Sequence, residues 1–290
     1  MELLEKEWFI QAPWGRMSIV AWGDCNDPPM LLCHGENDSA ASFRPLLRLL
    51  PKNFYYIGKL LPGNGKSDRF PPGLPISLLD LVFALEVVRR HFRWQQFIYL
   101  SHSIATTIGK YVGEGDPTYH IILILYDFFY TNFFDKYDVY NAPKEKAPVY
   151  TWNQVTIVLV LSCGRTVKPE VSAWVSTTAL SISAAKQCLF TIDQRMKLMT
   201  RPPFSQPQLK AIFVNCRTPT LAVMASNSIK RGLMDKTPYL MEEKDFDGTY
   251  RVRFVEGTHD VHVISPHLVA PYVRQFLLQG LEALDLKAKL

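Results

Sequence analysis

The chain has 290 residues, of which 48% are hydrophobic, and a formal net charge of +5 that is spread along its length. No basic cluster alternates with aromatic residues, which argues against nucleic-acid binding. The five cysteines lack C-x-x-C spacing, so neither a zinc site nor a disulfide framework is expected, and no cofactor or metal is predicted. The chain begins with acidic residues and contains no apolar stretch of membrane-spanning length. The composition therefore predicts an intracellular soluble protein.

The amino-terminal third alternates short strand patterns with helical patterns. Two alternating segments joined by a Pro/Gly turn, Trp8–Ile10 and Arg16–Trp22, predict a β-hairpin. Strands that alternate with helices indicate a mostly parallel sheet with crossover helices. Further along, strands are predicted over 28–33 and 53–57, helices over 42–50 and 78–92, and a glycine-rich loop over 61–68.

The loop Pro62-Gly-Asn-Gly-Lys-Ser67 contains a Gly-Lys-Ser sequence of the kind found in phosphate-binding loops. A P-loop requires G-x-x-x-x-G-K-[ST], and its first glycine would fall on Leu60. The loop is therefore not predicted to be a P-loop.

The stretch from Phe97 to Gly113 predicts a strand, a sharp turn at Ser101–Ala105 and a helix. This is the context of a nucleophile elbow, in which a serine lies at a strained strand-to-helix turn between small residues. Ser103 occupies the central position, with Ser101 and Ala105 in place of the usual glycines. The alternative is that Ser103 only caps the helix, because serine is favoured at helix amino termini.

His120–Tyr126 is an apolar run that ends at Asp127 and predicts an interior parallel strand. From 128 to about 208 the alternation of strands and helices is lost: 155–161 fits either a strand or a helix, and 170–189 has helical spacing. We therefore predict a core of residues 1–128 and 209–290, interrupted by a cap or lid insertion at 129–208. Strands at 218–224 and 250–255 and a helix at 266–284 resume the pattern after this insertion.

Four motifs occur in order: His34-Gly35 after a strand, the loop 62–68, the Ser103 turn, and Glu256-Gly-Thr-His259 before the last helix. Together they resemble the α/β-hydrolase superfamily, and more closely the serine hydrolase-like proteins. The resemblance implies an α/β-hydrolase fold, a mostly parallel eight-stranded sheet flanked by helices, here with an inserted helical cap. It covers almost the whole chain, through the stretches Ala12–Gly15, Ala21–Gly23, His34–Gly35, Asp38–Phe43, Phe54–Tyr56, Asp193–Arg195 and Gly257–His262.

The resemblance implies catalytic roles for three side chains. Ser103 would be the nucleophile, and His259, which follows Gly257 at the usual offset, would be the general base. Asp127 is a candidate for the triad acid, because relatives such as the haloalkane dehalogenases place their acid at the corresponding strand end. A simpler interpretation of Asp127 is a strand-end residue that caps the following turn.

The same resemblance places an oxyanion hole at the backbone N–H groups of Ile104 and Glu36. In that loop, His34 is expected to be a structural hydrogen-bonding residue, and His102 is expected to pack beside the nucleophile. His262 is the alternative base, or else a polar or capping residue of the pocket.

The sequence also departs from the superfamily pattern. Besides the altered glycines, Leu60 replaces an acidic residue, and Ser226-Asn-Ser228 follows the strand after which a triad acid is usual. Retention of Ser103 and His259 favours a serine hydrolase that cleaves an ester or related acyl bond of a small apolar substrate. The departures favour the alternative, a catalytically weakened relative that binds a small hydrophobic ligand without turning it over.

The final residues, Ala288-Lys289-Leu290, match a permitted form of the peroxisomal signal whose best-known form is S-K-L. A peroxisomal import receptor is therefore a predicted partner and peroxisomal localisation is expected; without that signal the protein would be cytoplasmic. The alternative is that these residues are a frayed basic helix end.

Overall fold

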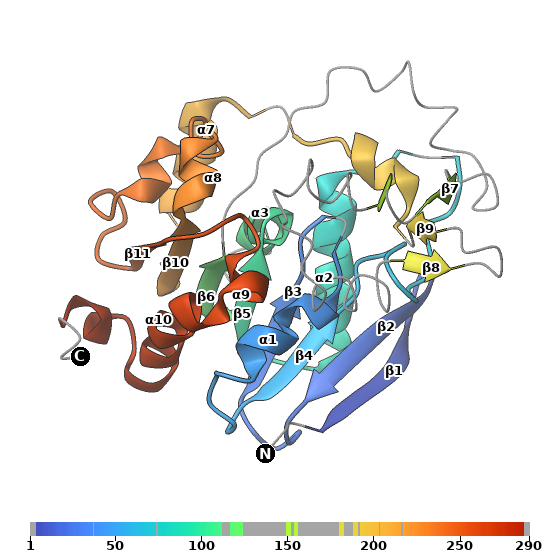
Figure 1. The fold of residues 1–290 in the computed structure, drawn as a ribbon, viewed down its shortest axis with the longest axis horizontal. Helices are drawn as coiled ribbons and strands as arrows, with labels where there is room; N and C mark the ends of the chain where they lie inside the picture. The colour runs from blue at the N-terminus through green and yellow to red at the C-terminus, as the bar shows by residue number, and fades with distance from the viewer. Residues whose placement is uncertain are drawn as a thin grey trace.

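An eight-stranded sheet with helices on both faces forms the centre of the protein, as the computed structural model shows (Figure 1). Its strands lie in the order β1-β2-β4-β3-β5-β6-β10-β11. None of the described helices has the length and apolarity that a membrane crossing requires. The residues that the structure describes are 4–36, 38–73, 75–111, 117–123, 149–151, 154–155, 180–182, 188–190, 192–202, 204–215 and 217–286.

The sheet begins with the predicted hairpin, in which β1 (Glu5–Ala12) pairs antiparallel with β2 (Gly15–Trp22). Strand β2 is also antiparallel to β4 (Tyr55–Lys59), and every later pairing in this sheet is parallel. The mostly parallel eight-stranded sheet predicted from the sequence is thus confirmed. The other five strands are β3 (Pro29–Cys33), β5 (Phe97–His102), β6 (Pro117–Leu123), β10 (Thr220–Ala225) and β11 (Tyr250–Val255).

Local signals explain why α2 (Leu78–Phe92) begins and ends where it does. The side chain of Ser77 accepts a hydrogen bond from the backbone N–H of Asp80, and the Asp80 carboxylate accepts one from the backbone N–H of Ser77. This reciprocal capping box satisfies two donors at the helix start, and Arg93 ends the helix in the left-handed conformation with φ 58°. The predicted bounds, 78–92, agree with the observed helix.

Two apolar layers hold the helices to the sheet. On one face, α2 and α3 (Ile104–Tyr111) bury residues such as Leu81 and Ile108 against Ile57. On the other face, α1 (Arg44–Leu47) and α10 (Pro266–Gln279) cover strand residues such as Leu32. Burying each such side chain contributes roughly 1.5–3 kcal/mol of transfer free energy. The remaining helices are η1 (Ala40–Phe43), η4 (Gln194–Leu198), α7 (Gln206–Val214), α8 (Ser226–Lys230), η5 (Pro238–Met241), α9 (Val261–Ile264) and η6 (Glu282–Asp285).

A separate antiparallel sheet lies within the predicted insertion, in the strand order β7-β9-β8. Its strands are Val149–Tyr150, Cys188–Phe190 and Leu180–Ile182. The helix predicted over 170–189 is therefore wrong at 180–182 and 188–189, because short apolar groups fit both periods and pairing between separate segments decided the outcome. The boundaries of the insertion stay a prediction, since most of 129–191 lies outside the described residues.

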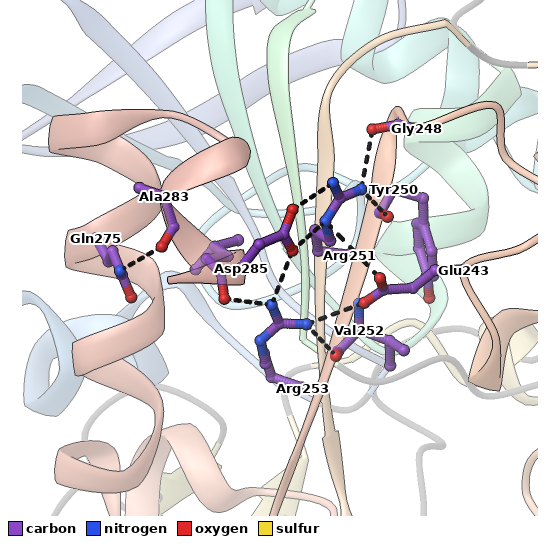
Figure 2. Close-up of polar contacts among 10 residues, drawn as sticks. Glu243, Gly248, Tyr250, Arg251, Val252, Arg253, Gln275, Ala283 and Asp285 are labelled. Atoms are coloured by element: carbon purple, nitrogen blue, oxygen red, sulfur yellow. Dashed lines mark hydrogen bonds and ion pairs between the residues drawn. The ribbon is translucent and has the colours of Figure 1, made fainter. Parts of the chain in front are cut away.

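Charged side chains fix the carboxyl-terminal η6 to the edge strand β11, as Figure 2 shows. The guanidinium of Arg251 donates two hydrogen bonds of 2.6 Å to the carboxylate of Asp285. These bonds hold the pKa of Asp285 below its usual range. Arg253 donates to the backbone carbonyl of Leu284 at 2.6 Å and to the carboxylate of Glu243 at 2.9 Å. The chain thus stays on the core until Leu286, which is 69% exposed.

Candidate active site

Ser103 lies between the end of β5 and the start of α3, at the predicted strand-to-helix turn. Its φ is 57°, in the left-handed region that costs a residue other than glycine about 1–2 kcal/mol. A capping serine normally has an extended backbone instead, so this geometry speaks against the simple capping interpretation. Ser103 is only 4% exposed and lies at the carboxyl edge of the sheet.

The residues that replace the usual glycines fit this turn because they are small and fully buried. Ser101 is 1% exposed, and its hydroxyl lies 3.2 Å from that of Thr106, within hydrogen-bond distance. The hydroxyl of Tyr99 donates to the backbone carbonyl of Ala105 at 2.7 Å. These bonds support both sides of the turn around Ser103.

The loop after β3 packs directly against Ser103. A Cβ atom on Gly35 would lie 2.9 Å from Nδ1 of His102 and 3.0 Å from Cβ of Ser103, so only glycine fits without displacement. The next residue, Glu36, is partly exposed, whereas Ile104 on the other side of Ser103 is 1% exposed. The two residues predicted to supply oxyanion donors therefore belong to segments that flank Ser103.

His34 is fully buried and joins this loop to the glycine loop. Its Nε2 accepts a hydrogen bond of 3.1 Å from the backbone N–H of Leu61, so Nδ1 carries the proton and donates to the carbonyl of Gly35 at 2.8 Å. Burial lowers the pKa of His34 to about 4, mainly because the charged imidazolium is desolvated. The ring is thus neutral near pH 7, as expected of a structural hydrogen-bonding residue.

His102 makes more contacts than the predicted packing beside the nucleophile. Its Nε2 lies 3.1 Å from the backbone carbonyl of His259, and its Nδ1 lies 3.7 Å from a carboxylate oxygen of Asp38. The ring centroid of His102 is 4.7 Å from that of His259 and 4.2 Å from that of His262. His102, which directly precedes Ser103, therefore contacts both the loop after β3 and the loop after β11.

The two candidate bases differ in exposure. His259 is partly exposed and lines a cavity, whereas His262 has no exposed surface and lies against Phe43 with ring centroids 5.6 Å apart. A general base must reach a bound substrate or a water molecule, and the accessible ring is better placed to do so.

Sequence reasoning missed two buried carboxylates at this site. Asp38 is 2% exposed and accepts a 2.7 Å hydrogen bond from the backbone N–H of Ser39. Asp260 is 1% exposed, and its Oδ1 lies 4.0 Å from Nε2 of His102. The available signals were the place of Asp38 shortly after His34-Gly35 and that of Asp260 next to His259. The predicted acid, Asp127, lies outside the described residues.

One group among the described residues has donor atoms close enough to hold a metal ion. One ligand atom from each of Asp38, His102 and His262 lies within 4.8 Å of the others, and all three residues are buried. Such mixed nitrogen and oxygen donors suit zinc. The same side chains also make the contacts that join the loops, and the chemistry proposed below does not need a metal.

A cavity of about 220 Å³ lies beside His259, where β10 and β11 end. The backbone N–H of Asn227 donates to the carbonyl of Gly257 at 3.1 Å, which holds the two bordering loops together. The superfamily usually supplies its acid after the strand that corresponds to β10, but no carboxylate lines the described part of this cavity. Its lining residues are Asn227, Ser228, Lys230, Arg231, Thr258 and His259.

Comparison with curated proteins finds similarity over nearly the whole chain, although no protein-family model matches. A Drosophila melanogaster protein named "Probable serine hydrolase" is 25% identical over 296 residues, covering 95% of this chain and 88% of that protein. A human serine hydrolase-like protein is 37% identical over 100 residues, which cover 34% of this chain and 49% of the human protein. The names of these two relatives support the interpretation of this chain as a hydrolase.

Comparison with solved structures supports the same fold. The thioesterase domain from the curacin biosynthetic pathway has a TM-score of 0.71 at 15% identity, covering 93% of this chain and 99% of that domain. An α/β hydrolase from Novosphingobium aromaticivorans has a TM-score of 0.63 at 14% identity, covering 97% and 99%. The chain therefore has the α/β-hydrolase fold and is similar in sequence to the serine hydrolase-like proteins.

Proposed function

We propose that the protein is a serine hydrolase that cleaves an ester or related acyl bond of a small apolar substrate. The observation that carries this proposal is the left-handed backbone of Ser103 at the turn between β5 and α3. That strained turn is next to His102, which contacts the backbone of His259. The names of the curated relatives agree with this chemistry.

In the proposed reaction, Oγ of Ser103 attacks the acyl carbon while His259 takes the serine proton. The backbone N–H groups of Ile104 and Glu36 donate to the oxyanion of the tetrahedral intermediate. When this intermediate collapses, His259 gives the proton to the leaving alcohol, and an acyl-enzyme remains on Ser103. A water molecule, deprotonated by His259, then attacks the acyl carbon. The bond between this carbon and Oγ of Ser103 breaks, His259 returns the proton to Oγ, and the carboxylic acid is released.

Asp127 stays the candidate for the acid that orients His259. The proposal does not depend on it, because an oxyanion hole and a nucleophile retain part of their catalytic effect when one triad member is lost.

The alternative is a protein that binds a small hydrophobic ligand without chemistry. It is favoured by Ser226-Asn-Ser228, which offers no carboxylate where the superfamily usually has one. The two functions differ in whether Ser103 reacts with an electrophile, which an activity-based probe measures directly.

Replacing Ser103 with alanine is expected to abolish covalent labelling by a fluorophosphonate probe and to lower ester turnover by about 10³–10⁶-fold. Ser265→Ala is the matched control, because Ser265 precedes α10 and makes no capping hydrogen bond with its side chain. Mass spectrometry of the labelled peptide would locate the adduct. Labelling that persists in the Ser103→Ala variant, or no labelling of the wild type together with tight binding of an apolar ligand, would contradict the proposal.

The peroxisomal address is a separate proposal. Leu286, the last described residue, is mostly exposed, so the described part of the chain ends at the surface of the core. A fluorescent protein fused to the amino terminus is expected to appear in peroxisomes and to become cytosolic when Leu290 is deleted, with little change in stability. Diffuse fluorescence from the full-length fusion would end this proposal.

A further inference from the structure

The cavity beside His259 has the size and the lining of a small-anion site. Its volume is about 220 Å³, whereas one water molecule occupies about 30 Å³ in the liquid, so the cavity has room for a small ion. Lys230 and Arg231 line it, so its positive charge favours an anion over a neutral guest. Glu256, two positions before Thr258, is not among the described lining residues. Its carboxylate accepts a 2.7 Å hydrogen bond from the hydroxyl of Ser226.

Two hydroxyl groups of the lining have unused hydrogen-bonding capacity. Ser228 is 2% exposed, and its Oγ makes no hydrogen bond within the described structure. The Oγ1 atom of Thr258, which is also buried, makes none there either. Buried hydroxyls without partners are costly, and both belong to the same cavity as the two cations. An oxygen-bearing anion would accept hydrogen bonds from these hydroxyls after rotation of their side chains.

We propose that this cavity binds a small carboxylate, which orients the His259 imidazole in place of an acidic side chain. The inference rests on the proposed function, since orientation of His259 matters for catalysis only if His259 is the base. A catalytic histidine needs an acceptor that fixes its tautomer and stabilises its charged form. The carboxylate stays ionised and is not consumed; it supplies the negatively charged acceptor for which Ser226-Asn-Ser228 offers no carboxylate.

Formate is the probe for the catalytic arm of the test, because it is the smallest carboxylate. The rate of fluorophosphonate labelling at Ser103 is expected to rise at least about tenfold with formate at constant ionic strength, and to saturate. Arg231→Gln should raise the formate concentration needed for half of this effect. Lys236→Gln, a change to an exposed cation outside the lining, should not.

Binding is measured separately from catalysis in a Ser103→Ala background. Formate is expected to shift the imidazole ¹⁵N resonances of His259 with the same concentration dependence as the rate effect, and Arg231→Gln should weaken this shift. Shifts of His259 without labelling of the wild type at any formate concentration would support the anion site while rejecting the hydrolase. The two proposals can therefore fail independently.

Ser228→Asp provides the complementary test, because it places a carboxylate within the lining. This variant is expected to label faster than the wild type without formate and to lose the formate response. Formate-independent labelling of the wild type with unchanged His259 resonances would overturn the inference. So would a formate response of equal strength in the wild type and in Ser228→Asp. If formate does not change the labelling rate of the wild type, and the Asp127→Asn variant loses labelling, the acid would be assigned to Asp127 instead.

Discussion

Replacing Asp193 with asparagine is expected to destabilise the protein by about 3–5 kcal/mol, the usual cost of breaking a buried ion pair. The side chains of Asp193 and Arg195 are only 2% and 8% exposed. Oδ2 of Asp193 lies 2.8 Å from Nη2 of Arg195. Arg195 also donates to the backbone carbonyls of Phe70 and Pro71, at 2.6 and 2.8 Å. Asparagine keeps the shape but leaves the buried guanidinium without this carboxylate.

The Asp193–Arg195 pair lies where two segments distant in sequence meet, so its loss is expected to weaken the contact between them as well as the pair itself. The backbone N–H of Asp193 donates to the carbonyl of Gly63 at 2.8 Å, and a Cβ on Gly63 would lie 2.5 Å from Cβ of Asp193. The pair therefore fixes residues 192–199, which lie within the predicted insertion at 129–208, to the glycine loop of the core.

Urea unfolding at pH 7 would measure this effect, with Asp285→Asn as the matched control. Asp285 is bound by Arg251 in the same bidentate manner, but its side chain is 48% exposed, so its loss should cost no more than about 1 kcal/mol. Equal destabilisation by the two substitutions would show that burial of the Asp193–Arg195 pair does not set its contribution.

Replacing Lys59 with methionine is expected to stabilise the protein by roughly 2–4 kcal/mol. Lys59 has no exposed surface, and its Nζ makes no hydrogen bond with any part of the chain that the structure describes. Its strand neighbours are Ile19 on β2 and Cys33 on β3, so the ammonium group is held inside the sheet. Methionine has a similar length and no polar group to desolvate.

The gain from Lys59→Met should depend on pH. Burial lowers the pKa of Lys59 in the folded protein, and Cys33 offsets only part of this effect. Between that pKa and the unfolded value of about 10.4, the unfolded chain binds more protons, so wild-type stability rises with pH. The advantage of methionine is therefore full below the folded pKa and shrinks as pH approaches about 10.4.

Denaturant unfolding from pH 6 to 10 would test both parts of this prediction. Lys66→Met is the control, since the Lys66 side chain is 64% exposed and pairs with Glu7 at the surface. A Lys59→Met variant that is less stable than the wild type would mean that the buried amine contributes favourable interactions to the fold.

The sequence by itself determined the elements whose signals are local. The capping residues Ser77 and Asp80 and the apolar face between them and Arg93 lie within one segment, so the bounds of α2 could be read directly. The alternating strands of the core and the turn at Ser103 were predictable for the same reason. A strained serine between a strand and a helix depends on only a few consecutive residues.

Only the tertiary structure decided the features that need distant segments to meet. The contact between His102 and His259 joins residues 157 positions apart, and Asp38 enters the same cluster from a third loop. The strands at 180–182 and 188–190 formed through pairing that no local period encodes. Lys59, near the end of its strand, is buried because the sheet order puts β4 between β2 and β3. Local patterns fix backbone shape, whereas burial and contact depend on which elements pack together.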